Sequence, residues 1–170
     1  TCIVKCFNAI KEIFLNKKPN LMPNLFTKST VCELGITFLY DGREFSYDLN
    51  YDAQDEEFIY EKFLEIQKDK YGNEKEILWL EKDTVNKTYY CIDEDVHLMM
   101  SLMSSNNLFC YVIDASKFEH LEKMKGIIVG FAKKIDIINM NNIPMKNTID
   151  LMKNKNSVQK RIVEFIKNAD

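Results

Sequence analysis

The clearest pattern in the chain is a pair of runs in which apolar and polar residues alternate, Val31–Tyr40 and Arg43–Leu49. Aromatic and leucine residues in the second run alternate with charged or hydroxylated ones, which gives a strand one apolar and one wet face. The two runs are joined by Asp41-Gly42, a dipeptide suited to a two-residue turn whose central residues take positive φ. The pattern predicts a β-hairpin.

The residues after the hairpin favour a helix. Asp52 is placed to cap a helix that begins near Ala53 and continues to Tyr71, and Gly72 is placed to end it. The predicted inner stripe is Phe58, Ile59, Phe63 and Ile66, and the predicted outer stripe is Glu57, Glu61, Glu65 and Lys68.

Three further apolar segments complete the middle of the chain. Ile77–Leu80 has the character of a buried strand, and Thr88–Ile92 that of its partner across a polar loop. Asp93 is placed to cap a short helix, whose apolar residues are Val96, Met99, Met100 and Met103. Leu108–Ile113 is a continuous apolar run of strand length, typical of a central strand covered on both faces.

The two ends of the chain indicate helices. Residues 2–15 form an amphipathic pattern that stops before Pro19. Ser116 and Glu119 form a capping box that opens a helix through Lys125, with Gly126 as its stop. Residues 127–139 fit either helix or strand, and helix is favoured. Residues 148–168 predict a last amphipathic helix.

The predicted order ββαββαβ indicates an α+β protein with the ubiquitin-like β-grasp fold. Helices are expected to flank this fold at both ends. The predicted organisation is an N-terminal helix and connector at 1–28, a β-grasp domain at 29–115, and a helical extension packed on it at 116–170.

Two parts of this middle segment resemble the Phox/Bem-type interaction domain, a β-grasp family that pairs through opposite charges. They are Ile36–Phe45, similar to the family's opening hairpin, and Leu80–Asp83 with Cys91–Val96, similar to its acidic strand-turn-helix segment. The family's basic residue on the first strand is missing where Thr37 and Leu39 stand, and Thr84-Val85-Asn86 replaces its glycine and second acidic residue. The resemblance implies a protein that binds through an acidic face.

Charge is divided unevenly along the chain. Between Asp41 and Asp95 there are seventeen Asp and Glu against seven Lys and Arg, whereas Lys117 to Lys167 has eleven Lys and Arg against five Asp and Glu. This division favours association of acidic with basic surfaces, although ordinary solvated helix faces also produce it. We therefore expect a protein–protein interaction module that binds a partner with a basic surface, or a second copy, through Asp83, Asp93, Glu94 and Asp95. For Asp93, the role of a simple helix cap stays open.

Two other functions stay open. A nucleic-acid-associated protein would use the basic C-terminal helices, through Lys133, Lys134, Lys153, Lys155, Lys160 and Arg161. A structural subunit of a larger assembly would pack its flanking helices on neighbouring subunits.

No residue pattern indicates a reaction centre. Cys91 and His97 belong to different predicted elements with no orienting carboxylate, and the scattered glycines form no phosphate loop. Cys2 and Cys6 lack the second ligand pair that a zinc site needs. We expect no enzyme activity, no cofactor and no metal. The five cysteines at irregular spacing indicate reduced thiols in an intracellular protein, cytoplasmic or nuclear, and no apolar run is long enough to span a membrane.

Overall fold

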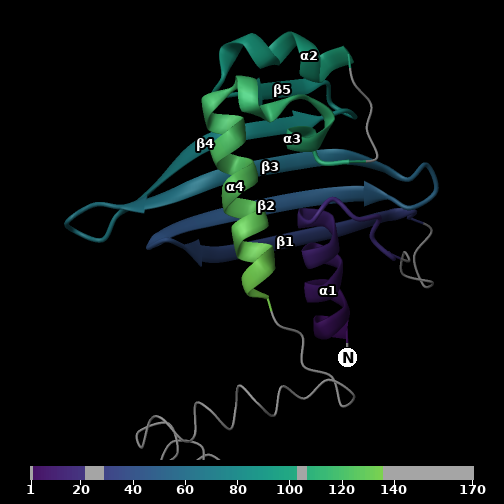
Figure 1. The fold of residues 1–170 in the computed structure, drawn as a ribbon, viewed down its shortest axis with the longest axis horizontal. Coiled ribbons are helices and arrows are strands. Elements are labelled where there is room, and N and C mark those ends of the chain that lie inside the picture. The colour runs from purple at the N-terminus through teal and green to yellow at the C-terminus, as the bar shows by residue number, and fades with distance from the viewer. Residues whose placement is uncertain (1, 22–28, 103–106, 136–170) are drawn as a thin grey trace, which may run out of the picture. The chain divides into compact units, whose positions relative to one another are not determined.

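The computed structural model describes residues 2–21, 29–102 and 107–135. Five strands form one antiparallel sheet in which each strand lies beside its neighbour in sequence (Figure 1). The strands are β1 (Val31–Tyr40), β2 (Arg43–Asp52), β3 (Glu57–Lys68), β4 (Glu74–Asp83) and β5 (Thr88–Cys91). The helices are α1 (Cys2–Phe14), η1 (Glu94–Val96), α2 (His97–Leu102), α3 (Phe109–Val112), η2 (Ala115–Lys117) and α4 (Glu119–Lys134).

The predicted hairpin is confirmed. Strands β1 and β2 pair from Tyr40↔Arg43 at the turn to Val31↔Asp52 at the far end. Asp41 and Gly42 both have positive φ, 49° and 77°, as a two-residue turn between right-twisted strands requires. The predicted strands at Ile77–Leu80 and Thr88–Ile92 are also found, in β4 and β5.

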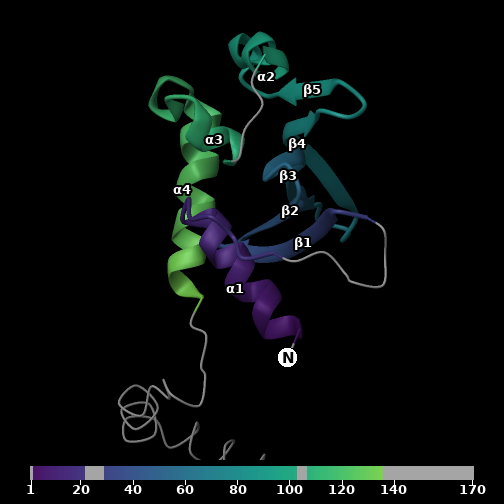
Figure 2. The same ribbon diagram turned by 90° about the vertical axis from the view of Figure 1, so that its right-hand side faces the viewer.

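One face of the sheet carries the core. Phe45, Tyr47 and Leu49 are buried, while the alternate residues of β2 stay partly exposed. Helices α1, α3 and α4 lie on this covered face, as the edge-on view shows (Figure 2). The other face, hereafter the open face, has none of these three helices over it (Figure 2), because all three pack on the apolar side chains of the covered face.

The predicted N-terminal helix is confirmed as α1, which packs on the sheet and is hydrogen-bonded to α3 and to the end of α4. The hydroxyl of Tyr111 in α3 donates to the carbonyl oxygen of Phe14 at 2.6 Å. Lys11 Nζ donates to the carbonyl oxygen of Ile135, just past the end of α4, at 2.6 Å. The chain up to Ile135 is therefore one compact unit that includes α1 and α4.

The helix predicted for residues 53–71 is wrong, because this segment is strand β3. Asp52 accepts hydrogen bonds from the backbone N–H of Gln54 at 2.9 Å and of Asp55 at 3.5 Å, so it shapes the turn between β2 and β3 instead of capping a helix. Glu61 and Glu65, expected on the outer stripe, are buried on the covered face. Gly72 does have positive φ, but in the β3–β4 turn.

The strand predicted at Leu108–Ile113 is also wrong, because Phe109–Val112 forms the short helix α3. A short run of apolar residues alone occurs both in buried strands and in buried helical turns, so the sequence pattern does not distinguish the two. Phe109 and Cys110 are buried, so the run does belong to the core.

The predicted helix after Ser116 is found, but its ends differ. Ser116 lies in η2, where its N–H and hydroxyl both donate to Asp114, so the expected capping box is not formed. Helix α4 passes through Gly126 and ends at Lys134, which confirms helix for residues 127–134. The helix predicted for 148–168 lies outside the described residues.

The α+β class is confirmed, whereas the ββαββαβ order is not, since β3 replaces the expected crossing helix and α3 the expected last strand. A helix between two strands would permit parallel pairing, but short turns between β1, β2, β3 and β4 leave antiparallel pairing as the only arrangement. Within the described ranges, no helix combines the length and apolar character needed to cross a membrane.

Candidate functional site

The structure does not gather the four predicted partner-binding carboxylates into one cluster. Asp83 lies opposite Thr88, the first residue of β5, whereas residues 93–95 follow Cys91, the last residue of β5. The length of β5, about 10 Å, therefore separates Asp83 from the others along the strand direction. Glu94 and Asp95 are exposed at the start of η1.

Asp93 is an intramolecular cap. Its carboxylate accepts hydrogen bonds from the backbone N–H of His120 at 3.1 Å and of Leu121 at 3.0 Å, and lies 2.9 Å from His120 Nδ1. These N–H groups belong to the first turn of α4, where a carboxylate also suits the positive end of the helix dipole. The Asp93 side chain is only 13 % exposed, so its helix-cap role is found, but for α4 instead of the short helix that follows it.

Asp83 has a structural role in the β4–β5 turn. It accepts hydrogen bonds from the backbone N–H of Asn86 at 2.8 Å and from its side-chain amide at 2.7 Å. Burial works to raise the pKa of Asp83, but the hydrogen bonds from Asn86 outweigh it and leave the pKa lowered. Asp83 is therefore held ionised at the margin of the open face.

The open face brings together Asp83, which the sequence predicted as a binding residue, with acidic residues that the sequence patterns did not single out. The register aligns Gly35, Asp48, Lys62, Glu81 and Tyr90 in one row that crosses all five strands. The adjacent row, on the same face, is Glu33, Asn50, Tyr60, Asp83 and Thr88. We call these two rows the acidic rows, since their carboxylates surround a single lysine, Lys62.

Two contacts define the geometry of the acidic rows. Tyr60 donates from its hydroxyl to Glu81 Oε1 at 3.4 Å. Burial, followed by the neighbouring Glu81 charge, raises the pKa of Tyr60 to about 12, so this hydroxyl keeps its proton at neutral pH. At the sheet edge, a Cβ added to Gly35 would lie 2.7 Å from Asp48 Oδ1, so the Asp48 carboxylate lies directly over the glycine. Asp48 thus presents its charge beside the outer edge of β1.

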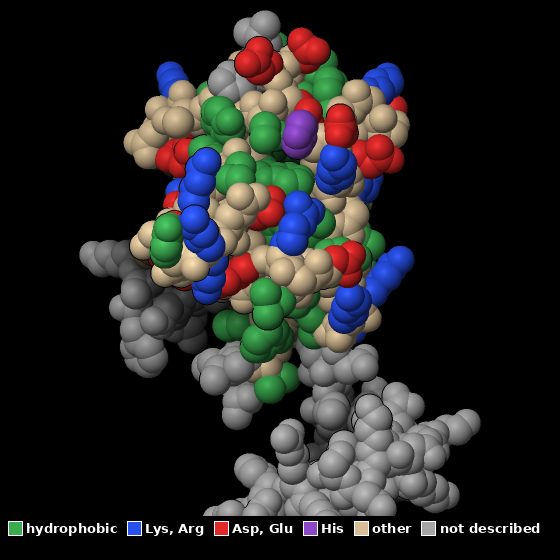
Figure 3. Space-filling view, turned by 90° about the vertical axis from the view of Figure 1, so that its left-hand side faces the viewer, with side chains coloured by type: hydrophobic (Ala, Val, Ile, Leu, Met, Phe, Trp, Pro, Cys, Tyr) green, Lys and Arg blue, Asp and Glu red, His purple; other side chains and the backbone are tan. Residues whose placement is uncertain are grey.

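Two of the predicted nucleic-acid-binding residues lie in the described part of the chain. Lys133 and Lys134 are exposed near the end of α4, where Lys134 Nζ lies 4.5 Å from the ring centre of Tyr40 and 3.8 Å from Asp41. The four other predicted nucleic-acid-binding residues, Lys153, Lys155, Lys160 and Arg161, lie outside the described residues. The side of the molecule in Figure 3 has basic and acidic side chains interspersed.

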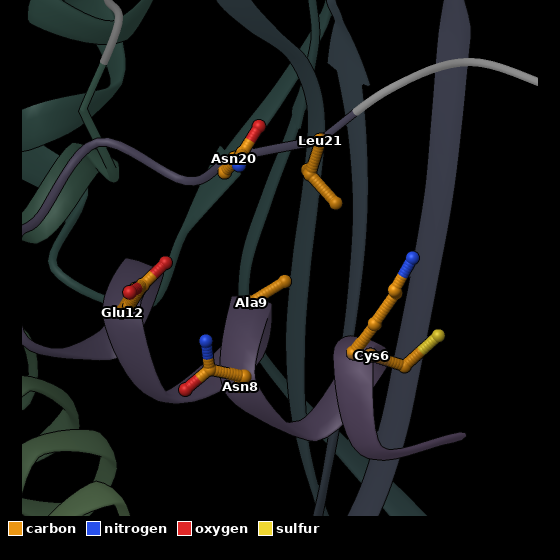
Figure 4. Close-up of a pocket in the computed structure, with 7 residues that line it drawn as sticks. Cys6, Asn8, Ala9, Glu12, Asn20 and Leu21 are labelled. Carbon is orange, nitrogen blue, oxygen red and sulfur yellow. The ribbon is translucent and has the colours of Figure 1, made fainter. Parts of the chain in front are cut away.

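A hollow of about 430 Å³ lies beside α1 (Figure 4). Its lining is Lys5, Cys6, Asn8, Ala9, Glu12, Asn20 and Leu21. In this view Cys6, whose thiol is free and exposed, and Glu12 lie at opposite ends of the hollow. Among the described residues, no group of three or more His, Cys, Asp or Glu side chains is arranged to hold a metal ion.

Three charged residues, Glu61, Glu65 and Lys82, are buried on the covered face. Glu61 accepts hydrogen bonds from the Tyr47 hydroxyl and from the backbone N–H of Phe109, and burial raises its pKa. Lys82 lies opposite Glu61 in the register, is fully buried, and finds no hydrogen-bond acceptor among the described residues. Burial lowers the Lys82 pKa. Glu61 thereby links β3 to the start of α3.

No family model, no curated protein and no solved structure matches this chain.

Proposed function

We propose that the protein is a non-catalytic interaction module whose open face binds a basic surface of a protein partner through the acidic rows. The observation that carries the proposal is the register that aligns Asp48 and Glu81 on either side of Lys62. Carboxylates held in rows on a rigid sheet produce a negative field over one face, which attracts basic partners and orients them on approach.

The proposal needs the whole array. A single exposed ion pair contributes about 0–1 kcal/mol, so one carboxylate alone is too weak a binding site. The hydroxyl of Tyr60 is occupied by Glu81, but an aromatic ring among carboxylates also attracts Lys and Arg side chains through its face.

This proposal does not depend on the ubiquitin-like β-grasp topology, whose expected element order is not found, or on the Phox/Bem resemblance, which stays a prediction. An antiparallel sheet with helices on one face offers an open surface on the other, whatever its ancestry. The expected intracellular location is part of the same proposal, and the free thiols of Cys91 and Cys110 support it.

A fluorescent decapeptide of alternating Lys and Thr is a suitable probe, and its anisotropy in a protein titration measures affinity. We expect Asp48→Asn combined with Glu81→Gln to weaken binding about tenfold or more, because neutral isosteres remove charge and keep shape. The matched control is Glu94→Gln with Asp95→Asn, which removes the same charge from η1 and should leave affinity within about twofold.

Wild-type affinity in the Asp48/Glu81 variant would overturn the proposal for the open face. Loss of binding confined to the Glu94/Asp95 variant would favour the cluster expected from the sequence instead.

A further inference from the structure

The outer edge of β1 is unpaired among the described strands. Strand β1 is the first in the sheet order, and β2 is its only described neighbour. It runs for 10 residues, whereas β5, at the opposite edge, has 4. An edge strand of this length presents a row of unpaired N–H and C=O groups, which can pair with another chain.

The register identifies which backbone groups point outward. The residues that flank a two-residue turn exchange both of their hydrogen bonds, so Tyr40 and Arg43 form a bonded pair, and bonded pairs recur at every second residue. The even-numbered residues of β1 therefore bond to β2. The backbone groups that point away from β2 belong to Glu33, Gly35, Thr37 and Leu39.

Two hydrogen bonds at the start of β1 confirm this alternation. The backbone N–H of Ala53 donates to the carbonyl oxygen of Thr30 at 3.0 Å, so the even-numbered side of the ladder faces β2. The N–H of Val31, on the outward side, donates to Ser29 Oγ at 3.1 Å and not to the sheet.

The outward residues are also the exposed ones on the open face. Glu33, Gly35, Thr37 and Leu39 are all exposed, and Leu39 reaches 70 %. Because Gly35 has no side chain, Asp48 of β2 extends over it toward the edge. A strand added to β1 would lie about 4.8 Å away, so its side chain in the Gly35 row would come within reach of the Asp48 carboxylate.

We propose that the partner binds as an extended segment with Lys or Arg at alternate positions, added as a further strand to the outer edge of β1. This inference rests on the proposed function and specifies how the same face is used. Backbone hydrogen bonds to Glu33, Gly35, Thr37 and Leu39 supply affinity that is independent of sequence. The basic side chains of the added strand lie in the acidic rows, opposite Glu33 and over Asp48, and supply specificity.

Amide hydrogen exchange of the wild-type protein, followed by NMR with and without the Lys-Thr decapeptide, tests the pairing directly. We expect exchange at Gly35, Thr37 and Leu39 to slow about tenfold or more when the peptide binds. The matched controls are the neighbouring amides of Ile36 and Phe38, which already donate to β2 and should change little. If the outward amides already exchange slowly without peptide, and exchange still more slowly at higher protein concentration, the occupant of the edge is a second copy. That result would overturn the inference.

Two N-methylated forms of the decapeptide separate strand addition from simple charge attraction. One is methylated at the Lys backbone nitrogens and the other at the Thr nitrogens, so each blocks one edge of the peptide strand and keeps all side chains. Alternate residues of a strand direct their backbone groups to opposite edges. Once the lysine side chains lie on the open face and the strand direction is set, either the Lys or the Thr backbone nitrogens face β1, but not both. We expect one peptide to lose about tenfold or more in affinity and the other to bind as before.

Equal affinity of the two methylated peptides, with the unmodified peptide still binding, would overturn strand addition and leave the proposed function standing. Failure of the unmodified peptide to bind would overturn the proposed function itself, and the two failures are therefore distinguishable.

Discussion

The carboxylate of Glu61 in β3 accepts a hydrogen bond from the backbone N–H of Phe109, the first residue of α3, at 2.9 Å. The Tyr47 hydroxyl of β2 donates to the same carboxylate, so one buried group joins two strands and a helix. An N–H at a helix start has no partner within the helix, and burial without an acceptor would destabilise it. Glu61 therefore fixes the position of α3 on the covered face.

Removal of this carboxylate should destabilise the fold. We expect Glu61→Ala to lower the free energy of unfolding by about 2–4 kcal/mol, because both buried donors lose their acceptor. Glu61→Gln keeps one acceptor oxygen and should cost less than Glu61→Ala. Urea unfolding followed by tryptophan fluorescence measures the change at Trp79. Glu122→Ala, an exposed control on α4, should stay within about 0.5 kcal/mol. An equally small effect of Glu61→Ala would contradict the role assigned to Glu61.

The pH dependence of stability should report the same group. Burial raises the Glu61 pKa above the ordinary 4.5, so the folded state favours the protonated form. The resulting contribution to stability is complete below pH 4.5 and is lost as pH rises through the raised pKa. Unfolding measured across this range should show wild-type stability falling relative to Glu61→Gln as pH rises. A difference that stays constant with pH, or grows in favour of wild type, would contradict a raised pKa.

Two glycines of α4 form a matched pair. A Cβ at Gly130 would lie 2.2 Å from Tyr40 Oη, whereas a Cβ at Gly126 would meet nothing within 4 Å. We expect Gly126→Ala to stabilise the protein by about 0.5–1 kcal/mol through helix propensity, and Gly130→Ala to destabilise it by about 1 kcal/mol or more through displacement of the Tyr40 ring. Thermal unfolding of both variants is the measurement. Equal stabilisation by both would show that Tyr40 does not constrain α4.

Replacement of Lys62 should change the affinity for the decapeptide in the opposite direction to replacement of the carboxylates. Its ammonium lies in the row between Asp48 and Glu81 and offsets part of their charge. Lys62→Gln should therefore strengthen binding of the Lys-Thr decapeptide by about two- to tenfold at low salt, with the gain shrinking as salt is added. Weaker binding by this variant would indicate that Lys62 itself contacts the partner.

Local signals in the sequence predicted the elements that local chemistry determines. Asp41-Gly42 requires positive φ whatever surrounds it, and α1 has one apolar stripe because one side of it is covered. The segment that forms β3 was predicted as a helix because Glu61 and Glu65 were expected to be exposed, as glutamates normally are. Their burial depends on partners that are distant in sequence, such as Phe109 and Arg43. The covered-face positions of β3 therefore include two carboxylates, so the alternation of apolar and polar residues typical of a strand is hidden in the sequence.

The candidate surface was harder to predict than the fold class. Asp48, Lys62 and Glu81 belong to three strands, and their alignment depends on registers that shift at a bulge in each of two strand pairs. The alternation of polar with apolar residues in β2 indicated a solvent-exposed face. It did not indicate which residues of the neighbouring strands would lie beside Asp48 on that face. Asp93 was expected to cap the short helix that follows it, but its carboxylate caps α4, which begins 26 residues later at Glu119.

The central claim is that the acidic rows of the open face bind a basic polypeptide, and an NMR titration of the ¹⁵N-labelled protein with the Lys-Thr decapeptide tests it most directly. The account predicts that the largest shift changes fall on the amides of Glu33, Asp48, Lys62 and Glu81, and that they weaken as salt rises. Changes confined to Glu94 and Asp95 or to the end of α4, with the acidic rows unaffected, would contradict it.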